Sequence, residues 1–316
     1  MTKRLLCIFH GGCDDGFGAA WAVRQALGDE NVEFYPGVYQ QPPPDVTDRH
    51  VAIVDFSYKR PVLLEMAAKA HSVLILDHHK SAQEDLSGIS SDVPMGQVPD
   101  FDDYCERFLF ARNPPPIRPI IWAEFDMNRS GAGMTWDYFM GHENRPEFIN
   151  YLEDRDLWRK RLPRGDEFTI ALRSYPQDFT VWNQLCWDSG VDRLISEGTH
   201  IQRYYRARIE ELKRSAYPAV MEIGDNVWVT CRIANAPYFA ASEVAGELCG
   251  DDVDFGASYF EVRPGLWQYS LRSRGEFDVS KVALTFGGGG HRNAAGFTAK
   301  ATAHSRVYTS DGGFAP

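Results

Sequence analysis

Residues 74–82 read LILDHHKSA, a short apolar run that ends in one acid and two adjacent imidazoles. The run predicts a buried strand, so Asp77, His78 and His79 lie where this strand leaves its sheet. Taken alone, the stretch also fits an ordinary turn, where short polar residues are common. The neighbouring sequence decides between a turn and a functional site.

The first half of the chain alternates strand and helix patterns. Strands are predicted at RLLCIFH (4–10), HVAIVDF (50–56) and SVLILDHH (72–79), and helices at 15–27 and 60–71. This βαβαβ order predicts the α/β class, with a parallel sheet covered by helices. Ligands of such sheets collect at the carboxyl ends of the strands.

Acids and imidazoles follow three of these predicted strands, so we expect them at one edge of the sheet. His10 opens HGGCDDG (10–16), Asp55 follows the second strand, and Asp77–His79 end the third. Carboxylates that converge on one point repel each other unless a cation compensates them. Oxygen and imidazole ligands suit Mn²⁺, Mg²⁺ or Fe²⁺ better than structural zinc, and two ions about 3.5–4 Å apart could share a carboxylate. Cys13 is expected to pack or to face solvent rather than to bind metal.

Composition narrows the class of protein. The 316 residues carry a net charge of −11 and are 44% hydrophobic, which supports folded cores and argues against binding to long duplex DNA. The six cysteines form no C-x-x-C pair, and neither a signal-peptide pattern nor an apolar run of about 20 residues occurs. We therefore expect a cytoplasmic enzyme or binding protein without a membrane partner.

The length exceeds that of a usual single domain and predicts two domains. The expected parts are a catalytic domain over 1–190, a connecting helix over 191–220, a smaller C-terminal α/β domain over 221–302 and a tail over 303–316. Residues 84–120 are polar and interrupted by prolines, so they are expected to form an insertion.

Five motifs in a fixed order resemble the DHH phosphoesterase superfamily, in particular its members with a DHH-associated C-terminal domain. They are HGGCDDGFGAAWA, VDF, LDHHKSA, LEDRDLW and FGGGGHRNAAGF, and they span nearly residues 4 to 298. The resemblance implies a centre of two Mn²⁺ ions, with Mg²⁺ or Co²⁺ as substitutes, that hydrolyses phosphodiester or phosphoanhydride bonds. It also implies an active site in the cleft between the two domains.

Carried over by position, the resemblance implies a set of metal ligands. These are His10, Asp14, Asp15, Asp55, His78 and Asp154. Asp55 would bridge the two metals. His79 would act on the scissile phosphate as a catalytic residue, and Asp77 would orient the loop that carries both histidines.

Two assignments within this set stay open. Many family members separate the two acids of the first motif by one residue, whereas Asp14 and Asp15 are adjacent here. Asp15 is the safer ligand, while Asp14 either binds metal or caps the following helix. In EDRD, Asp154 is preferred over Asp156, because two residues at this spacing do not share a helix face.

The C-terminal glycine run is expected to bind the substrate. Gly288, Gly289, Gly290 and the adjacent His291 favour close approach of main-chain N–H groups to an anion, and a merely flexible loop is the alternative. By resemblance, this segment holds a phosphate or terminal nucleotide, and Arg272 is a phosphate contact.

The segment WRKRLPRG (158–165) is the one concentrated basic run. A solvated helix end is the simpler interpretation, and guidance of an anionic substrate is the other. Trp158 could stack a base, although a tryptophan in such a place more often belongs to the core.

The predicted function is hydrolysis of short oligonucleotides or dinucleotides by a hydroxide held between two metals. A pyrophosphate-type hydrolase is one alternative. A nucleotide-binding regulatory protein with little or no hydrolase activity is another, because the shortened first motif could have lost one metal. Whether the chain forms a homodimer stays open.

Overall fold

The computed structural model describes residues 5–89, 121–224, 227–300 and 307–309. The chain divides into two compact units between residues 201 and 202, inside helix α9 (Gly190–Lys213). Most of the predicted insertion and of the predicted tail lies outside the described residues. Within the described ranges, no helix is both long and apolar enough to cross a membrane.

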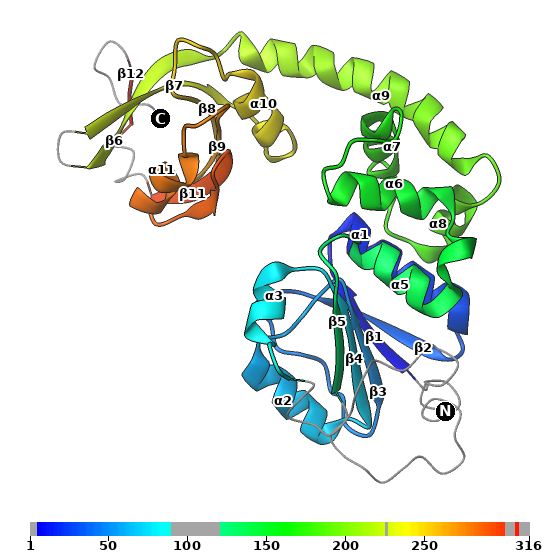
Figure 1. Cartoon of the computed structure of the whole chain (residues 1–316). Helices are drawn as coiled ribbons and strands as arrows, with labels where there is room; N and C mark the ends of the chain where they lie inside the picture. The colour runs from blue at the N-terminus through cyan, green and yellow to red at the C-terminus, as the bar shows by residue number, and fades with distance from the viewer. Residues whose placement is uncertain (1–4, 90–120, 225–226, 301–306, 310–316) are drawn as a thin grey trace. The chain divides into compact units, whose positions relative to one another are not determined.

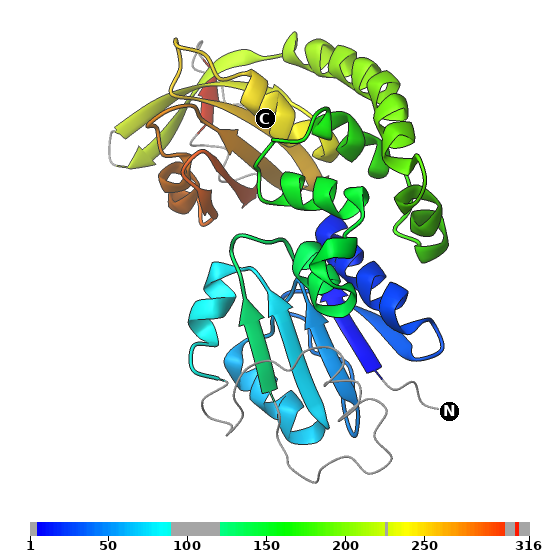
Figure 2. The same ribbon diagram turned by 45° about the vertical axis from the view of Figure 1, so that its right-hand side comes forward.

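The first unit is built on a parallel five-stranded sheet, which confirms the predicted α/β class. Its strands are β1 (Leu5–His10), β2 (Val32–Gly37), β3 (His50–Val54), β4 (Ser72–Asp77) and β5 (Ile121–Phe125). They lie in the order β2-β1-β3-β4-β5, with their carboxyl ends at one edge (Figures 1 and 2). The chain leaves β1 toward β2 on one side and continues from β3 on the other. The edge above β1 and β3 is therefore the switch point at which doubly wound sheets bind ligands.

Helices cover both faces of this sheet (Figure 1). They are α1 (Asp14–Leu27), α2 (Arg60–Lys69), α3 (Lys80–Asp85) and α5 (Gly131–Met140). Alternate residues of β1 belong to two different cores: Leu5 and Cys7 pack on the side of α1 and α5, while Leu6 and Ile8 pack on the side of α2. Because both faces are buried, β1, β3 and β4 are continuous apolar runs rather than alternating ones.

A second layer of helices lies over α1 and α5. It contains the 3-10 helix η2 (His142–Asn144), α6 (Glu147–Asp156), α7 (Gly165–Leu172) and α8 (Phe179–Cys186). The core between the layers is aromatic, with Trp21 stacked on Trp136 at 5.4 Å between ring centroids and Phe148 against Trp182 at 5.2 Å. These four rings are almost fully buried, so they fix the position of α6 above the sheet.

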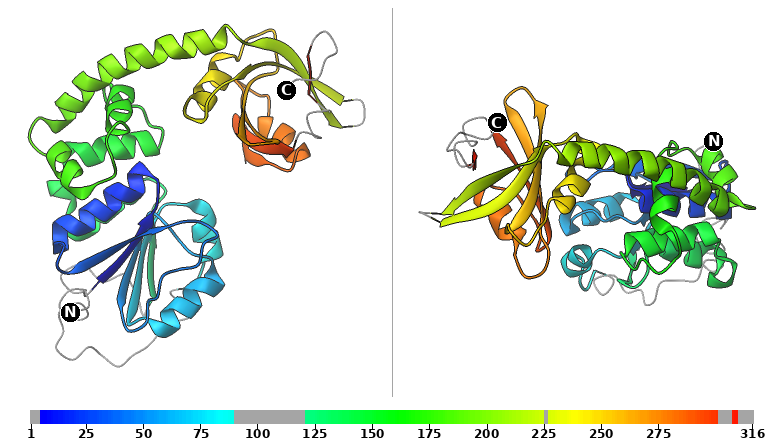
Figure 3. Two further views of the ribbon diagram at one scale, coloured as in Figure 1. Left: turned by 180° about the vertical axis from the view of Figure 1, so that it is seen from behind. Right: turned by 90° about the horizontal axis from the view of Figure 1, so that it is seen from above.

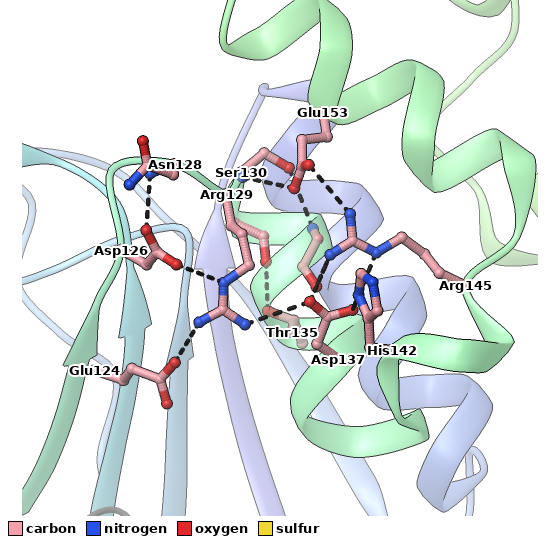
Figure 4. A network of polar contacts seen from close by, with 12 residues as sticks. Glu124, Asp126, Asn128, Arg129, Ser130, Thr135, Asp137, His142, Arg145 and Glu153 are labelled. Atoms are coloured by element: carbon pink, nitrogen blue, oxygen red, sulfur yellow. Dashed lines mark hydrogen bonds and ion pairs between the residues drawn. The ribbon is translucent and has the colours of Figure 1, made fainter.

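Figure 4 shows an ion-pair network that joins α5 to α6. Arg145, only 8% exposed, contacts Asp137 of α5 at 2.5 Å and Glu153 of α6 at 3.1 Å. The other carboxylate oxygen of Glu153 accepts the backbone N–H of Ser130, which caps α5. Arg129, in the same turn, joins Asp137 to the end of β5. The network therefore locks the β5–α5 turn against the helix that carries the EDRD motif.

The second unit contains a seven-stranded mixed sheet in the order β10-β11-β9-β8-β7-β6-β12. Its strands are β6 (Tyr217–Gly224), β7 (Val227–Asn235), β8 (Phe255–Arg263), β9 (Leu266–Arg272), β10 (Gly289–His291), β11 (Ala294–Lys300) and β12 (Val307–Thr309). Figure 3 gives two further views of this curved sheet. All neighbouring strands are antiparallel except β7 and β8.

Helices pack on both faces of the second sheet as well. They are the 3-10 helix η3 (Tyr238–Ala240), α10 (Ala241–Glu247) and α11 (Val279–Thr285). Phe255 and Tyr259 of β8 pack on the side of α11, while the intervening Ser258 donates its hydroxyl to Ala241 O on the side of α10. The helix predicted to extend to 220 ends earlier, because β6 begins at Tyr217 and takes the following residues into the sheet.

Candidate metal centre

His78 lies at the centre of a cluster of acids at the carboxyl edge of the first sheet. Its Nε2 atom lies 3.1 Å from Asp55 Oδ1, 3.5 Å from Asp156 Oδ2 and 3.8 Å from Asp15 Oδ2. The histidine follows β4, Asp55 follows β3, Asp15 lies in the first turn of α1 and Asp156 ends α6. Four elements therefore deliver their polar side chains to one point, and this arrangement excludes the simple turn.

Asp55 has an unusual backbone and an incompletely paired side chain. Its φ of 54° lies in the left-handed region, and its N–H donates to Leu76 O of the neighbouring strand at 2.9 Å. A Cβ on Gly131 would lie 2.3 Å from Asp55 Cβ, so only glycine fits there. Asp55 is 1% exposed, and His10 Nδ1 approaches its Oδ2 at 3.5 Å. Neither of these two buried atoms has a hydrogen-bond partner among the described residues.

Asp15 is held by the amino terminus of α5. Its two oxygens accept the N–H groups of Gly131 at 2.6 Å and of Ala132 at 3.1 Å. The helix dipole favours an anion at this position. The close approach of α1 to β1 also requires Gly16, where a Cβ would lie 2.3 Å from His10 O. The DDG sequence therefore serves both the helix packing and the placement of the carboxylate.

Asp77 is fully buried and organises the two histidines that follow it. Its Oδ1 accepts the backbone N–H groups of His78 at 2.8 Å and of His79 at 3.2 Å, and it lies 2.7 Å from His79 Nδ1. Its Oδ2 accepts the hydroxyl of Ser57 at 2.6 Å. With Nδ1–H donated to Asp77, the His79 ring keeps Nε2 for other partners.

The electrostatics of the cluster favour a bound cation. Burial lowers the pKa of His78, but the hydrogen bond and attraction from Asp55, together with Asp15 and Asp156, outweigh burial and raise it to about 9. Burial, and then repulsion from neighbouring acids, raises the pKa of Asp15 well above its usual value. Burial also raises the pKa of Asp156. Burial opposes ionisation of Asp55 too, yet His10 and His78 hold its pKa at about 2.

Three groups of side chains among the described residues could hold a metal ion. They are His10 with Cys13 and Asp55, Asp55 with His78 and His79, and Asp15 with His78 and Asp156. Within each group the ligand atoms lie within 4.8 Å of one another. Buried carboxylates that share imidazoles, with Asp55 Oδ2 and His10 Nδ1 left without hydrogen bonds, fit a divalent cation.

Two of the predicted ligands lie outside this cluster. The Asp14 carboxylate accepts from Arg173 Nε at 2.8 Å, because the adjacent acids at the start of α1 point in different directions. Asp154 accepts the N–H groups of Arg161 at 3.0 Å and Leu162 at 3.2 Å. The structure thus places Asp156, and not the preferred Asp154, beside His78. Residues two positions apart on a helix differ in direction by about 200°, so only one of the two acids can face His78.

Two aromatic residues lie near the cluster, and the sequence pointed only to Trp158, as a residue that could stack a base or belong to the core. Tyr39, just after β2, lies 5.2 Å from His10 and 6.5 Å from His79 between ring centroids. Burial, and then the charges of Asp77 and Asp55, raise the pKa of the Tyr39 phenol, so its hydroxyl stays protonated and can donate a hydrogen bond. Trp158 is 67% exposed rather than in the core. No motif in the sequence marks Tyr39.

A pocket of about 160 Å³ borders the acids. Its lining includes Cys13, Asp15, Asp156, Arg155, Arg173 and Trp158. The Arg155 guanidinium lies 4.2 Å from the centroid of the Trp158 ring. One wall is therefore acidic and another is cationic and aromatic. Burial, followed by the charge of Asp55, raises the pKa of the Cys13 thiol to about 12, so without a cation Cys13 is not an ionised nucleophile.

The predicted substrate contacts of the second unit lie on the edge strand β10, just before it, and at the end of the inner strand β9. Gly289, Gly290 and His291 form the exposed edge strand β10, and Gly288 precedes it. Gly288 packs so closely on β11 that a Cβ would lie 2.2 Å from Gly296 O. Arg272 donates to Ser242 Oγ at 2.7 Å, and burial lowers its pKa. Part of the glycine run thus serves the hairpin, and binding of an anion there stays a prediction, as does an active site between the domains.

No protein-family model matches the chain. The uncharacterized protein R106 of Acanthamoeba polyphaga mimivirus is 28% identical over 309 residues, which cover 92% of this chain and 66% of that protein's length. The pGpG-specific phosphodiesterase PggH from Vibrio cholerae shows 12% identity and a TM-score of 0.45 over 97% of this chain and 96% of its own. RecJ from Thermus thermophilus, in complex with Mn²⁺, shows 14% identity and a TM-score of 0.45 over 93% of this chain and 49% of the RecJ chain. Likeness at this level establishes no activity, so the site's own geometry carries the functional assignment.

Proposed function

We propose that the protein is a metal-dependent phosphoesterase that hydrolyses phosphodiester bonds in short oligonucleotides or dinucleotides. The observation that carries this proposal is the approach of three carboxylates, from Asp15, Asp55 and Asp156, to His78 Nε2 within 3.8 Å. Such a charge arrangement is costly to bury without a cation. The cluster also lies at the switch point of a parallel sheet, where ligands of such sheets are expected to bind.

Divalent cations bound there would supply Lewis-acid stabilisation of negative charge on a phosphoryl group. The chain's own residues divide the remaining work. Asp55 faces both His10 and His78 and would join two ion positions. Asp15 and Asp156 would complete the position on the His78 side.

His79 is placed to act on the substrate. Asp77 fixes its Nδ1 at 2.7 Å and raises its pKa through that hydrogen bond, so the ring is readily protonated. A protonated His79 would donate from Nε2 to a phosphoryl or leaving oxygen. Tyr39, whose ring lies beside those of His10 and His79, would supply a second hydrogen-bond donor on that side.

The pocket beside the acids offers contacts to the phosphate and base of a nucleotide. Arg155 and Arg173 offer guanidinium groups to phosphate oxygens, and the exposed Trp158 offers a ring face to a base. The chain's net charge of −11 disfavours long polyanions, so a short substrate fits the combination of a local cationic wall and an acidic surface.

The test is Mn²⁺-dependent hydrolysis of pApA, a five-nucleotide RNA, long single-stranded DNA and pyrophosphate. His78→Ala removes the central ligand, and His200→Ala, at an exposed position of α9, is the matched control. Cleavage of the short substrates that is lost only in His78→Ala supports the proposal. Cleavage restricted to pyrophosphate, or unaffected by His78→Ala, would contradict it.

One observation favours a second candidate function, a nucleotide-binding regulatory protein. Asp14 pairs with Arg173 at 2.8 Å instead of joining the cluster, so the His10 side has one acid fewer. A centre with a single cation would bind a nucleotide but turn it over poorly. Binding of a dinucleotide without cleavage, at one cation or fewer per chain, is the result that would select this candidate.

A further inference from the structure

The His10 side of the cluster lacks a ligand that the sequence pattern would supply. Asp15 accepts a backbone N–H at the amino terminus of α5 and faces His78. Asp14 accepts hydrogen bonds from the side chains of Arg173 and, at 3.4 Å, Gln177. Neither acid therefore joins His10 and Asp55. Two protein ligands alone would hold a divalent cation weakly.

The Cys13 side chain lies on this side of the cluster. Its Sγ belongs to the group in which the ligand atoms of His10, Cys13 and Asp55 lie within 4.8 Å of one another. Cys13 is the residue before α1, with extended backbone (φ −111°, ψ 138°), and its side chain makes no capping hydrogen bond.

A second observation points into the same space. Asp55 Oδ2 and His10 Nδ1 are both buried and lack hydrogen-bond partners among the described residues. Asp55 is 1% exposed, and a buried carboxylate oxygen without a donor is costly. The oxygen and the imidazole nitrogen, which approach each other at 3.5 Å without a hydrogen bond, thus converge with the sulfur on one position that a cation would satisfy.

We propose that Cys13 is a thiolate ligand that completes, with His10 and Asp55, one of the two metal positions. The shortened first motif then loses no ligand, since a sulfur replaces the carboxylate that Asp14 does not provide. Metal binding would release the thiol proton to solvent. A soft sulfur ligand shifts the preference of this position away from Mg²⁺ and Mn²⁺ toward Co²⁺ and Zn²⁺. This inference concerns the same cluster as the proposed function, and it does not depend on which substrate is hydrolysed.

Cobalt titration of the metal-free full-length protein tests this inference without any substrate. Thiolate ligation gives a near-ultraviolet sulfur-to-cobalt charge-transfer band, and Co²⁺ bound by oxygen and nitrogen alone gives only visible d–d bands. The wild type is expected to show the charge-transfer band. Cys13→Ser should remove it and weaken Co²⁺ binding at that position by at least about tenfold.

Three variants make the result specific. Cys13→Asp should lose the band, keep Co²⁺ binding, and bind Mn²⁺ more tightly than the wild type does. Asp14→Asn should keep the band, because its carboxylate faces Arg173. Cys249→Ser, which removes a part-buried thiol of the second unit, should also keep it.

The outcomes separate this inference from the proposed function. A band that persists in Cys13→Ser, or Co²⁺ bound to the wild type without the band, would overturn the role of Cys13. If cleavage of pApA is nevertheless lost in His78→Ala, the proposed function still stands. A Cys13-dependent band without hydrolysis supports the ligand and contradicts the phosphoesterase, and failure of Co²⁺ to bind at all overturns both.

Discussion

Asp55 Oδ1 lies 3.1 Å from His78 Nε2, and the other oxygen of the same carboxylate lies 3.5 Å from His10 Nδ1. One buried acid thus stands between two imidazoles that come from the ends of β1 and β4. The sheet order brings these ends to either side of β3, which Asp55 follows. If Asp55 bridges two cations, substitutions beside it should change cation binding, and substitutions that face away from it should not.

The two acids of EDRD are expected to have separable roles. Asp156→Asn should weaken divalent-cation binding at least about tenfold, because Asp156 faces His78, without lowering the free energy of unfolding. Asp154→Asn should leave cation affinity unchanged and lower the free energy of unfolding by roughly 1–3 kcal/mol. Asn keeps a single acceptor oxygen, and its NH2 group would face one of the backbone N–H groups of Arg161 and Leu162 that the carboxylate now accepts. Calorimetric cation titration and urea unfolding of both variants check this. The reverse pattern would restore Asp154 as the ligand.

Gly131→Ala is expected to displace Asp55. The new Cβ would lie 2.3 Å from Asp55 Cβ, so the backbone has to move and the Asp55 carboxylate moves with it. The overpacking is expected to cost about 1–3 kcal/mol. Cation affinity and the free energy of unfolding should both fall. Gly246→Ala in α10 is the matched control, since no atom lies within 4 Å of its Cβ position. Calorimetric metal titration of Gly131→Ala with wild-type affinity would show that Asp55 is not the shared ligand.

The Trp158 face of the pocket is expected to govern substrate affinity rather than turnover. Trp158→Ala should raise the KM for a dinucleotide by roughly ten- to a hundredfold, corresponding to about 1–3 kcal/mol of stacking, with little change in kcat. Trp158→Phe should recover much of the loss. Trp228→Ala, which removes an exposed tryptophan from the second unit, serves as the control. Steady-state kinetics with pApA give both parameters, and a fall in kcat alone would rule out stacking.

The free energy of unfolding is expected to fall in acid, and part of this fall should depend on His50. His50 lies at the start of β3, at the opposite end of the strand from the cluster. His50 is buried, with Nδ1 2.8 Å from Ser72 Oγ. Burial, together with the nearby His71, lowers its pKa from 6.5 to about 4. Because the folded pKa is below the unfolded one, the unfolded state binds more protons between these values. The stability present above pH 6.5 is then lost as the pH falls toward 4.

The loss that depends on His50 is expected to reach roughly 2–3 kcal/mol between about pH 7.5 and about pH 4.5. His50→Gln keeps a polar side chain at this position and removes the titration. Urea unfolding of the two proteins at both pH values gives the difference. An equal loss of stability in wild type and variant would assign the pH dependence to other groups.

Strands β1, β3 and β4 of the first unit could be predicted because each is a continuous apolar run that ends in a polar residue or is followed by one. Strand β5, in which Glu124 interrupts a short apolar run, was not predicted. The runs ending at His10 and Asp77 predicted both the sheet and the edge at which its polar groups meet. The strands of the second unit were harder to predict from the sequence. The short strands β10 and β12 have no comparable apolar run, and β6 begins where the helical spacing of α9 fades.

The choice among neighbouring acids could not be made from spacing. Asp14 or Asp15, and Asp154 or Asp156, are distinguished by the directions in which α1 and α6 present them, and these depend on packing between distant segments. Cys13 was set aside because a lone thiol more often packs than binds metal. Only the unpaired atoms of His10 and Asp55 beside it indicate otherwise.

The most direct test of the two-cation centre is the stoichiometry of divalent-cation binding to the wild type and to Asp55→Asn, measured by calorimetry with Mn²⁺ and Co²⁺. Asp55 faces both imidazoles, so two cations per wild-type chain and the weakening of both in Asp55→Asn are the predicted result. One cation or none in the wild type, or unchanged binding in Asp55→Asn, would contradict a centre built around this carboxylate.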